Sequence, residues 1–209
     1  MEQMKITDTE FVVFDVETTG LSALDGDRII EIAGVKIKNL KTVEEFSTFI
    51  NPGRDVPIEA QNIHGITNEM IQDAPSSEDY LPKIIDFVGG ACLVGHNISF
   101  DLKFLCYELS LAGRKLHPAT PAVDTLKMAR KLIPYLSNYR LGHLANSLGV
   151  KVNTTHRALD DVKLTSSVLI HLLQKATKQY ITNFPELYKQ FGVEKPNYPI
   201  TQISQEMLF

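Results

Sequence analysis

The sequence has few of the residues that cross-link small proteins or place them in membranes. It contains two cysteines, Cys92 and Cys106, which lie in apolar stretches without CxxC spacing. This pattern favours reduced, buried thiols over a disulfide framework or a structural zinc site. The apolar run from Phe11 to Phe14 is far too short to span a bilayer, and no signal peptide precedes it. We therefore expect a cytoplasmic protein without a membrane segment.

An excess of basic residues is also absent. The chain has 21 Lys and Arg against 25 Asp and Glu, a formal net charge of −4. A protein held on nucleic acid by a broad basic surface has the opposite balance, so we expect only a weak intrinsic hold on a polyanion. With 44% hydrophobic and 22% charged residues, the composition excludes disorder and fibrous repeats. The 209 residues predict one domain over residues 1–178 and a C-terminal extension over 179–209.

The order of predicted elements indicates an α/β fold. A short buried strand at 11–14 is followed by an antiparallel pair at 28–39 and 42–51. Later strands and helices alternate, which predicts a mixed sheet with helices on both faces. These later elements are helical segments within 57–88, a strand at 91–97 leading into a helix near Ser99 with its hydroxyl as N-cap, a strand end and helix at 122–132, and helices at 141–150, 158–178 and 184–192.

Two carboxylates follow the first strand directly, in the segment DVETTG. Residues i and i+2 of a strand point to the same face, so Asp15 and Glu17 lie side by side at the carboxyl end. Burial of two like charges is unfavourable unless a cation neutralises them. A capping role for one acid and solvent exposure for the other is the alternative for an isolated pair.

Two further acids begin helices. Asp101 lies in the first turn of the helix after the strand at 91–97, where strand ends of an α/β sheet meet in one crevice. In HRALDD, helical periodicity places Asp161 on the face that contains Leu164 and Val168, whereas Asp160 shares a face with charged and polar residues. We therefore expect Asp161 to point inward. His156 lies just before this helix.

Four carboxylates without cysteine ligands favour hard cations, Mg²⁺ or Mn²⁺. Two such ions about 4 Å apart stabilise the attacking and leaving oxygens of a displacement at phosphorus. His156 is suited to accept the proton of the attacking water, since imidazole titrates near neutral pH.

The segments FDVETTG, GHNISFD and HRALDD, together with NIHGIT, resemble in order and spacing the motifs of the DEDDh (DnaQ-like) 3′→5′ exonuclease family, over roughly Glu10 to Lys175. That family includes the proofreading subunits and domains of bacterial replicative polymerases. The resemblance implies a ribonuclease H-like fold with a five-stranded mixed sheet flanked by helices. It also implies two Mg²⁺ or Mn²⁺ ions, His156 as general base and four metal ligands, Asp15, Glu17, Asp101 and Asp161.

The resemblance further implies residues that bind the substrate. Thr18, Thr19 and Leu21 would line the pocket of the 3′-terminal nucleotide, and His64 would lie near the terminal sugar and phosphate. Asn97 and Phe100 would position or stack on the penultimate nucleotide. Simple core packing is an equal alternative for Leu21 and Phe100. We expect Asp124 to cap the following helix.

The chain ends in QEMLF, which resembles the peptide with which bacterial replication and repair proteins bind the β sliding clamp. An extended segment of this kind offers a polar anchor and apolar side chains to a preformed groove. The residues that would make these contacts are Gln205, Met207, Leu208 and Phe209. Folding back onto the domain is the alternative. A tether of this kind would compensate for a weak hold on DNA.

We therefore predict a two-metal exonuclease that releases nucleoside 5′-monophosphates from DNA 3′ ends in proofreading or repair. A DNA polymerase subunit is a further expected partner. An RNA-trimming relative of the ribonuclease T or oligoribonuclease kind is an alternative, because discrimination depends on contacts to the 2′-hydroxyl. An inactive adaptor of the same fold is a third possibility, although none of the five polar residues of the motifs is missing.

Overall fold

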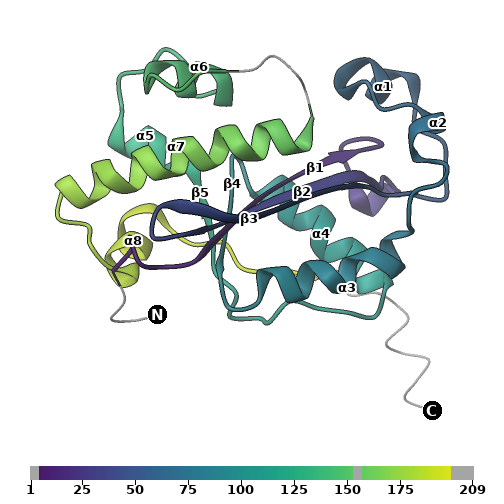
Figure 1. The fold of residues 1–209 in the computed structure, drawn as a ribbon, viewed down its shortest axis with the longest axis horizontal. Helices are drawn as coiled ribbons and strands as arrows, with labels where there is room; N and C mark the ends of the chain where they lie inside the picture. The colour runs from purple at the N-terminus through teal and green to yellow at the C-terminus, as the bar shows by residue number, and fades with distance from the viewer. Residues whose placement is uncertain (1–4, 153–156, 199–209) are drawn as a thin grey trace.

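A single five-stranded sheet forms the centre of the protein (Figure 1), whose computed structural model describes residues 5–152 and 157–198. The strand order is β3-β2-β1-β4-β5. β1 (Phe11–Thr18), β2 (Ile29–Lys38) and β3 (Lys41–Phe49) are antiparallel neighbours, whereas β4 (Cys92–Gly95) and β5 (Ala122–Asp124) run parallel to β1. The predicted α/β fold with a mixed sheet, and the antiparallel pair beside the first strand, are confirmed.

Helices cover both faces of the sheet (Figure 1). One face packs against α3 (Ser77–Val88) and α4 (Ser99–Leu111). The other packs against α5 (Thr125–Leu132), α6 (Leu141–Ser147), α7 (Ala158–Lys178) and α8 (Phe184–Phe191). The short helices η1 (Ala23–Asp25), α1 (Ile58–His64) and α2 (Asn68–Ile71) lie in the loops after β1 and β3. No helix within the described residues is long and apolar enough to cross a bilayer.

The alternation of side chains along β1 determines which residues meet α7. Phe11 and Val13 belong to the core beneath α7, whereas Val12, Phe14 and Val16 belong to the core beneath α4. Asp15 and Glu17 continue the row of Phe11 and Val13, since strand side chains alternate between faces. The strand therefore delivers both carboxylates to the face that α7 covers.

The bounds of the helices test two of the predicted caps. The side chain of Asp124 accepts a hydrogen bond from the Leu126 amide at 2.8 Å, which confirms it as the cap of α5. The predicted cap at Ser99 is wrong, because Ile98 occupies the N-cap position and already has helical dihedral angles. Ser99 is the first residue of α4, where its hydroxyl is past the position that caps the free amides.

Candidate functional site

Three carboxylates meet at the carboxyl end of β1. One oxygen each from Asp15, Glu17 and Asp161 lies within 4.8 Å of the other two. Asp161 belongs to the first turn of α7, which packs over the face of β1 that carries the other two acids. The carboxyl end of the central strand and the start of a helix far away in sequence thus form one acidic site.

Asp101 joins β1 from the other side. It is the third residue of α4, is 5% exposed, and accepts a hydrogen bond from the Val16 amide at 3.2 Å. That amide lies between Asp15 and Glu17 in the chain, so the bond fixes α4 beside the acidic strand end. Asp101 is outside the three-carboxylate cluster, but its charge is the neighbouring charge that most raises the pKa of Asp15.

The electrostatics of the site oppose ionisation. Burial, followed by repulsion from Asp101 and Glu17, raises the pKa of Asp15 well above its usual range. Burial and repulsion from Asp161 raise the pKa of Glu17 to about 8, although the positive charge of Arg157 acts in the opposite direction. Burial raises the pKa of Asp101 to about 7. The site therefore favours a bound cation, which would restore the ionised forms.

Helical periodicity selected the aspartate that the structure places in the cluster. The side chains that share a face with Asp161, Leu164 and Val168 among them, are buried in the core beneath α7. Asp160 is in the same helical turn but outside the cluster, on the side of the exposed Lys163. The two adjacent acids are therefore a natural matched pair for mutagenesis.

An ion pair between the partly exposed Arg157 and the buried Glu31, which the sequence reasoning missed, holds the start of α7. Glu31 on β2 is directly opposite Glu17 in the strand register and is 1% exposed. Its carboxylate accepts a hydrogen bond from the Arg157 guanidinium at 2.8 Å and another from the Ala158 amide at 3.3 Å. Arg157 also lies over the ring of Phe49, 4.9 Å from its centroid. Glu31 thus anchors the helix that presents Asp161.

A charged residue within an apolar strand was the signal available for Glu31. The segment IIEIAGV has one acid among buried aliphatic residues. A buried carboxylate is retained where a partner compensates its charge. The partner itself, Arg157, lies 126 residues away, beyond any local pattern.

Of the two histidines of the predicted site, only His64 belongs to the described residues. His156 lies outside the described residues, one position before Arg157. His64 is 6% exposed, and its Nδ1 accepts a hydrogen bond from the Ile66 amide at 3.0 Å. Its buried Nε2 has no hydrogen-bond partner among the described residues, although the Thr18 backbone is close enough to affect its pKa. Burial lowers the pKa of His64, which favours the neutral ring.

The loop after β1 is held by its own polar groups. The Thr18 hydroxyl donates to the Gly20 carbonyl at 2.6 Å, and the Thr19 hydroxyl donates to Asp27 at 3.3 Å. A side chain at Gly20 would collide with the Asp27 carboxylate, since a Cβ there would lie 2.3 Å from one of its oxygens. The side chain of Leu21 is 85% exposed, which excludes core packing as its role.

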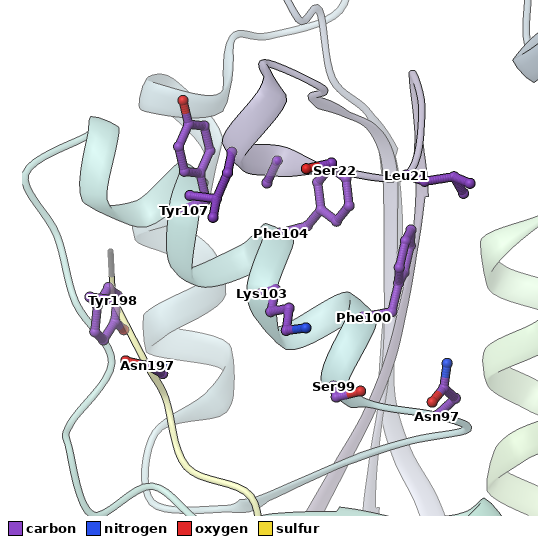
Figure 2. A pocket seen from close by; sticks show the side chains of 12 residues that line it. Leu21, Ser22, Asn97, Ser99, Phe100, Lys103, Phe104, Tyr107, Asn197 and Tyr198 are labelled. Atoms are coloured by element: carbon purple, nitrogen blue, oxygen red, sulfur yellow. The ribbon is translucent and has the colours of Figure 1, made fainter. Parts of the chain in front are cut away.

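A cavity of about 490 Å³ lies between this loop and α4. Figure 2 shows Leu21 and Phe100 at one side of it, with Asn97 at the start of the helix. Asn97 has a φ of 69°, and its backbone amide donates a hydrogen bond to the Asp124 carboxylate at 2.9 Å, which fixes the turn. Phe100 is half-buried and packs against Phe104 at a centroid distance of 5.0 Å. The structure thus brings three predicted substrate residues to one cavity.

The predicted clamp-binding residues cannot be placed. Gln205, Met207, Leu208 and Phe209 lie outside the described residues. The segment before them is described as far as Tyr198 and packs against the domain through α8 and residue Glu194. Tyr198, Lys103 and Tyr107 also line the cavity, and the sequence reasoning did not find them.

The sequence profile of the Exonuclease family (RNase_T) matches residues 12–169, which include both strand and helix sources of the acidic site. The chain therefore belongs to the exonuclease family. This confirms the predicted resemblance and the predicted class of enzyme, a nuclease that works from a chain end.

Curated relatives fall into two size classes. The chain is 36% identical over 176 residues to the DNA polymerase III subunit epsilon of Aquifex aeolicus, covering 84% of this chain and 86% of that protein. It is 42% identical over 178 residues to the PolC-type DNA polymerase III of Caldanaerobacter subterraneus, covering 85% of this chain and 12% of the relative. The chain thus spans about one eighth of the length of the PolC-type relatives that it matches.

Solved structures have the same fold. Exonuclease X in complex with 5′-overhanging duplex DNA superposes with a TM-score of 0.64 and 29% identity, covering 87% of this chain and 97% of that one. E. coli Exonuclease I in complex with a dA16 oligonucleotide superposes with a TM-score of 0.73 at 19% identity, covering 83% of this chain and 43% of that one. These neighbours confirm the ribonuclease H-like fold.

Proposed function

We propose that the chain is a divalent-metal-dependent 3′→5′ exonuclease that removes nucleoside 5′-monophosphates from DNA ends. The observation that carries the proposal is the cluster of Asp15, Glu17 and Asp161, whose oxygens lie within 4.8 Å of one another in an exonuclease-family chain. Half-buried carboxylates this close to one another favour a cation between them. Two Mg²⁺ or Mn²⁺ ions would carry four positive charges, equal to the formal negative excess of the chain.

The donor set fits such ions, because among the described residues it contains carboxylates and no thiolate or imidazole. Asp15, Glu17, Asp101 and Asp161 would hold them. The ions would supply Lewis-acid stabilisation of the negative charge that develops on the phosphodiester. The Val16 amide keeps Asp101 oriented, and the Glu31 carboxylate keeps the start of α7 in place.

Two histidines complete the proposed machinery. His156 precedes the anchored Arg157 and would accept the proton of the attacking water. His64 has a buried Nε2 without a hydrogen-bond partner among the described residues, and a buried polar atom without a partner is unfavourable. We assign it a hydrogen bond to the terminal sugar or phosphate. Leu21, Asn97 and Phe100, at the cavity beside the loop after β1, would contact the terminal nucleotides, together with the backbone of Thr18 and Thr19.

DNA is the substrate that the relatives favour. Two relatives that this chain matches over most of their own length are named as a polymerase III subunit and as an exonuclease in complex with DNA. The same names favour an enzyme that acts on DNA in the bacterial cytoplasm and has a polymerase subunit as partner. The terminal QEMLF would recruit the enzyme to the sliding clamp through an extended peptide.

The matched variants Asp161→Asn and Asp160→Asn test the activity. Each would be mixed with 5′-labelled single-stranded DNA, mispaired primer and RNA of the same sequence, with Mg²⁺, Mn²⁺ or EDTA. We expect Asp160→Asn to shorten DNA from the 3′ end at the wild-type rate and Asp161→Asn to be inactive. Equal activity of the two variants, or activity in EDTA, would overturn the proposed metal site. Faster cleavage of RNA than of DNA would overturn the proposed substrate.

A separate experiment tests recruitment. Deletion of residues 205–209 should abolish binding to a purified bacterial β clamp while the rate on naked oligonucleotides stays the same. The controls are the full-length chain and the variant Ser204→Ala, whose substitution lies just outside the peptide. Equal clamp binding by the truncated and full-length chains would refute recruitment through QEMLF.

A further inference from the structure

The cavity between α4 and the loop after β1 is lined by more residues than the family motifs account for. Leu21, Asn97 and Phe100 line one side of its 490 Å³. The opposite side is lined by Tyr107, in the middle of α4, and by residues from the C-terminal segment. Figure 2 shows Tyr107 and Tyr198 at the side of the cavity away from Leu21.

The C-terminal segment that forms this far wall is fixed in place. The backbone of Glu194 exchanges two hydrogen bonds with Ala122 on β5, at 2.8 and 3.0 Å, and its carboxylate pairs with Lys127 at 2.6 Å. The segment thus adds a short antiparallel contact at the edge of the sheet. The chain after α8 therefore runs along β5 at Glu194 and reaches the cavity at Asn197 and Tyr198.

Tyr198 is anchored through its hydroxyl. The Leu116 amide donates a hydrogen bond to the Tyr198 hydroxyl at 2.6 Å. The ammonium group of Lys115 lies 5.4 Å from the centroid of the Tyr198 ring. With its polar end held by the backbone, the half-buried ring contributes an apolar surface to the cavity.

The chemistry of the cavity wall that α4 forms suits a nucleotide. Phe100, Lys103 and Tyr107 follow one another along α4 at spacings of three and four residues, so they share one helical face. The exposed Lys103 lies between the two aromatic residues, where its charge can meet a phosphate. Aromatic faces bind bases of any sequence, and a nearby cation follows the backbone of a single strand.

We propose that Tyr107, Tyr198 and Lys103 form a second nucleobase subsite, which takes the base next to the one at Phe100 and the phosphate that joins the two. This inference rests on the proposed function. It makes the C-terminal segment part of the substrate site, in addition to any role in recruitment. Continuity of one cavity from Phe100 to Tyr198 is the observation that carries it.

The variants Tyr198→Leu and Tyr198→Phe test the subsite with two substrates, a single-stranded dT8 oligonucleotide and the p-nitrophenyl ester of thymidine 5′-monophosphate. The ester has one base and cannot reach a second subsite. Loss of one stacked base should raise the ratio of the oligonucleotide KM to the ester KM about tenfold in Tyr198→Leu. Tyr198→Phe keeps the ring and should restore the ratio. Tyr135→Leu, which removes a 96% exposed tyrosine elsewhere, is the matched control.

A second variant keeps the test valid if Tyr198→Leu fails to fold. Lys103→Met alters an exposed side chain of α4 and should raise the same KM ratio and reduce the salt dependence of oligonucleotide binding by about one phosphate contact. An unchanged ratio in Lys103→Met and in folded Tyr198→Leu would overturn the subsite. Failure of the wild-type protein to hydrolyse either substrate would instead contradict the proposed function.

Discussion

A buried carboxylate, Glu108, and a cluster of three half-buried carboxylates have opposite surroundings in this molecule. Glu108 on α4 is fully buried and accepts two hydrogen bonds from the Arg28 guanidinium, both at 2.8 Å, and a third from the Ile29 amide at 3.1 Å. The acids at the end of β1 instead face one another, with oxygens of Asp15, Glu17 and Asp161 within 4.8 Å. Arg28 neutralises the charge of Glu108, whereas the cluster at the end of β1 brings like charges together.

The difference separates structure from function. A buried carboxylate with a bidentate guanidinium partner joins two elements, here α4 and the start of β2, and needs nothing from outside. Clustered carboxylates raise one another's pKa and weaken the metal-free fold, so such a cluster favours the binding of a cation. The same residue type is thus paired in one place and, in the function that we propose, binds a metal ion in the other.

The largest expected effect is on activity at the clustered group. Asp15→Asn should lower the exonuclease rate by on the order of 10⁴-fold, as for other residues that act within one catalytic unit. The same change removes a repelling charge, so the metal-free variant should melt at a higher temperature than the wild type at pH 8. Thermal unfolding with and without Mg²⁺, together with gel assays on labelled DNA, measures both.

Asp73→Asn, which alters an exposed acid, is the control for this change. An Asp15→Asn protein that Mg²⁺ still stabilises as it does the wild type would contradict the comparison, since the cluster would then not be the cation site.

A change at the paired carboxylate, Glu108, should show the reverse pattern, a loss of stability with little loss of activity. Glu108→Gln leaves Arg28 without its anionic partner in a buried contact and should lower the free energy of unfolding by about 3 kcal/mol. For a domain of this size, this corresponds to a fall in Tm of roughly 6–12 °C. Denaturant titration and melting curves measure the loss, and the rate per folded molecule at 20 °C should stay close to that of the wild type.

Glu44→Gln is the matched control, because Glu44 pairs with Lys36 at 3.7 Å with its side chain 58% exposed, and such a pair contributes less than about 1 kcal/mol. Equal destabilisation by the two variants would remove the distinction between a buried and an exposed pair.

Glu31 lies between the two cases, because its carboxylate is neutralised by Arg157 and yet stands opposite Glu17 in the sheet. Glu31→Gln should free the positive charge of Arg157 beside the cluster and loosen the start of α7. The Mg²⁺ concentration for half-maximal activity should then rise about tenfold, as for other groups that orient metal ligands. A fall in Tm with an unchanged Mg²⁺ requirement would reduce Glu31 to a structural role.

The smallest expected effect is the change in metal-free stability with each unit of pH. The pKa of Glu17 is raised to about 8 and that of Asp101 to about 7, so in the metal-free fold both bind protons that the unfolded chain has lost. Stability without metal should therefore fall as the pH rises from about 5 to 8, while Mg²⁺ affinity rises over the upper part of that interval. Melting curves at pH 6, 7, 8 and 9 with and without Mg²⁺ test this. A metal-free Tm that rises with pH would contradict the sign.

Local sequence patterns were sufficient to locate the acidic site. Alternation along β1 placed Asp15 and Glu17 on one face, and the helical period chose Asp161 over Asp160, because both periods are properties of the backbone itself. The bounds of α7 and the Asp124 cap followed from equally local signals. The Ser99 cap failed because Asn97 makes the turn and lets the helix begin at the next peptide.

Contacts between distant segments had no such signal. Arg157 meets Glu31 from 126 residues away, and Arg28 meets Glu108 from 80 residues away. Leu116 holds Tyr198 across 82 residues, so the C-terminal wall of the cavity exists only in the folded chain. Each of these pairs depends on which strands neighbour one another and on which face a helix packs.

The sequence by itself therefore determined the class of fold, the exonuclease family motifs and the acids that face inward, because strand and helix periodicity act over a few residues. The tertiary structure decided which carboxylate pairs with a guanidinium group, as Glu108 does with Arg28, and which carboxylates meet in one cluster. It also decided that the segment after α8 lines the cavity beside α4. Charge compensation and cavity shape depend on distances across the molecule, which only packing of the sheet and its two helical layers sets.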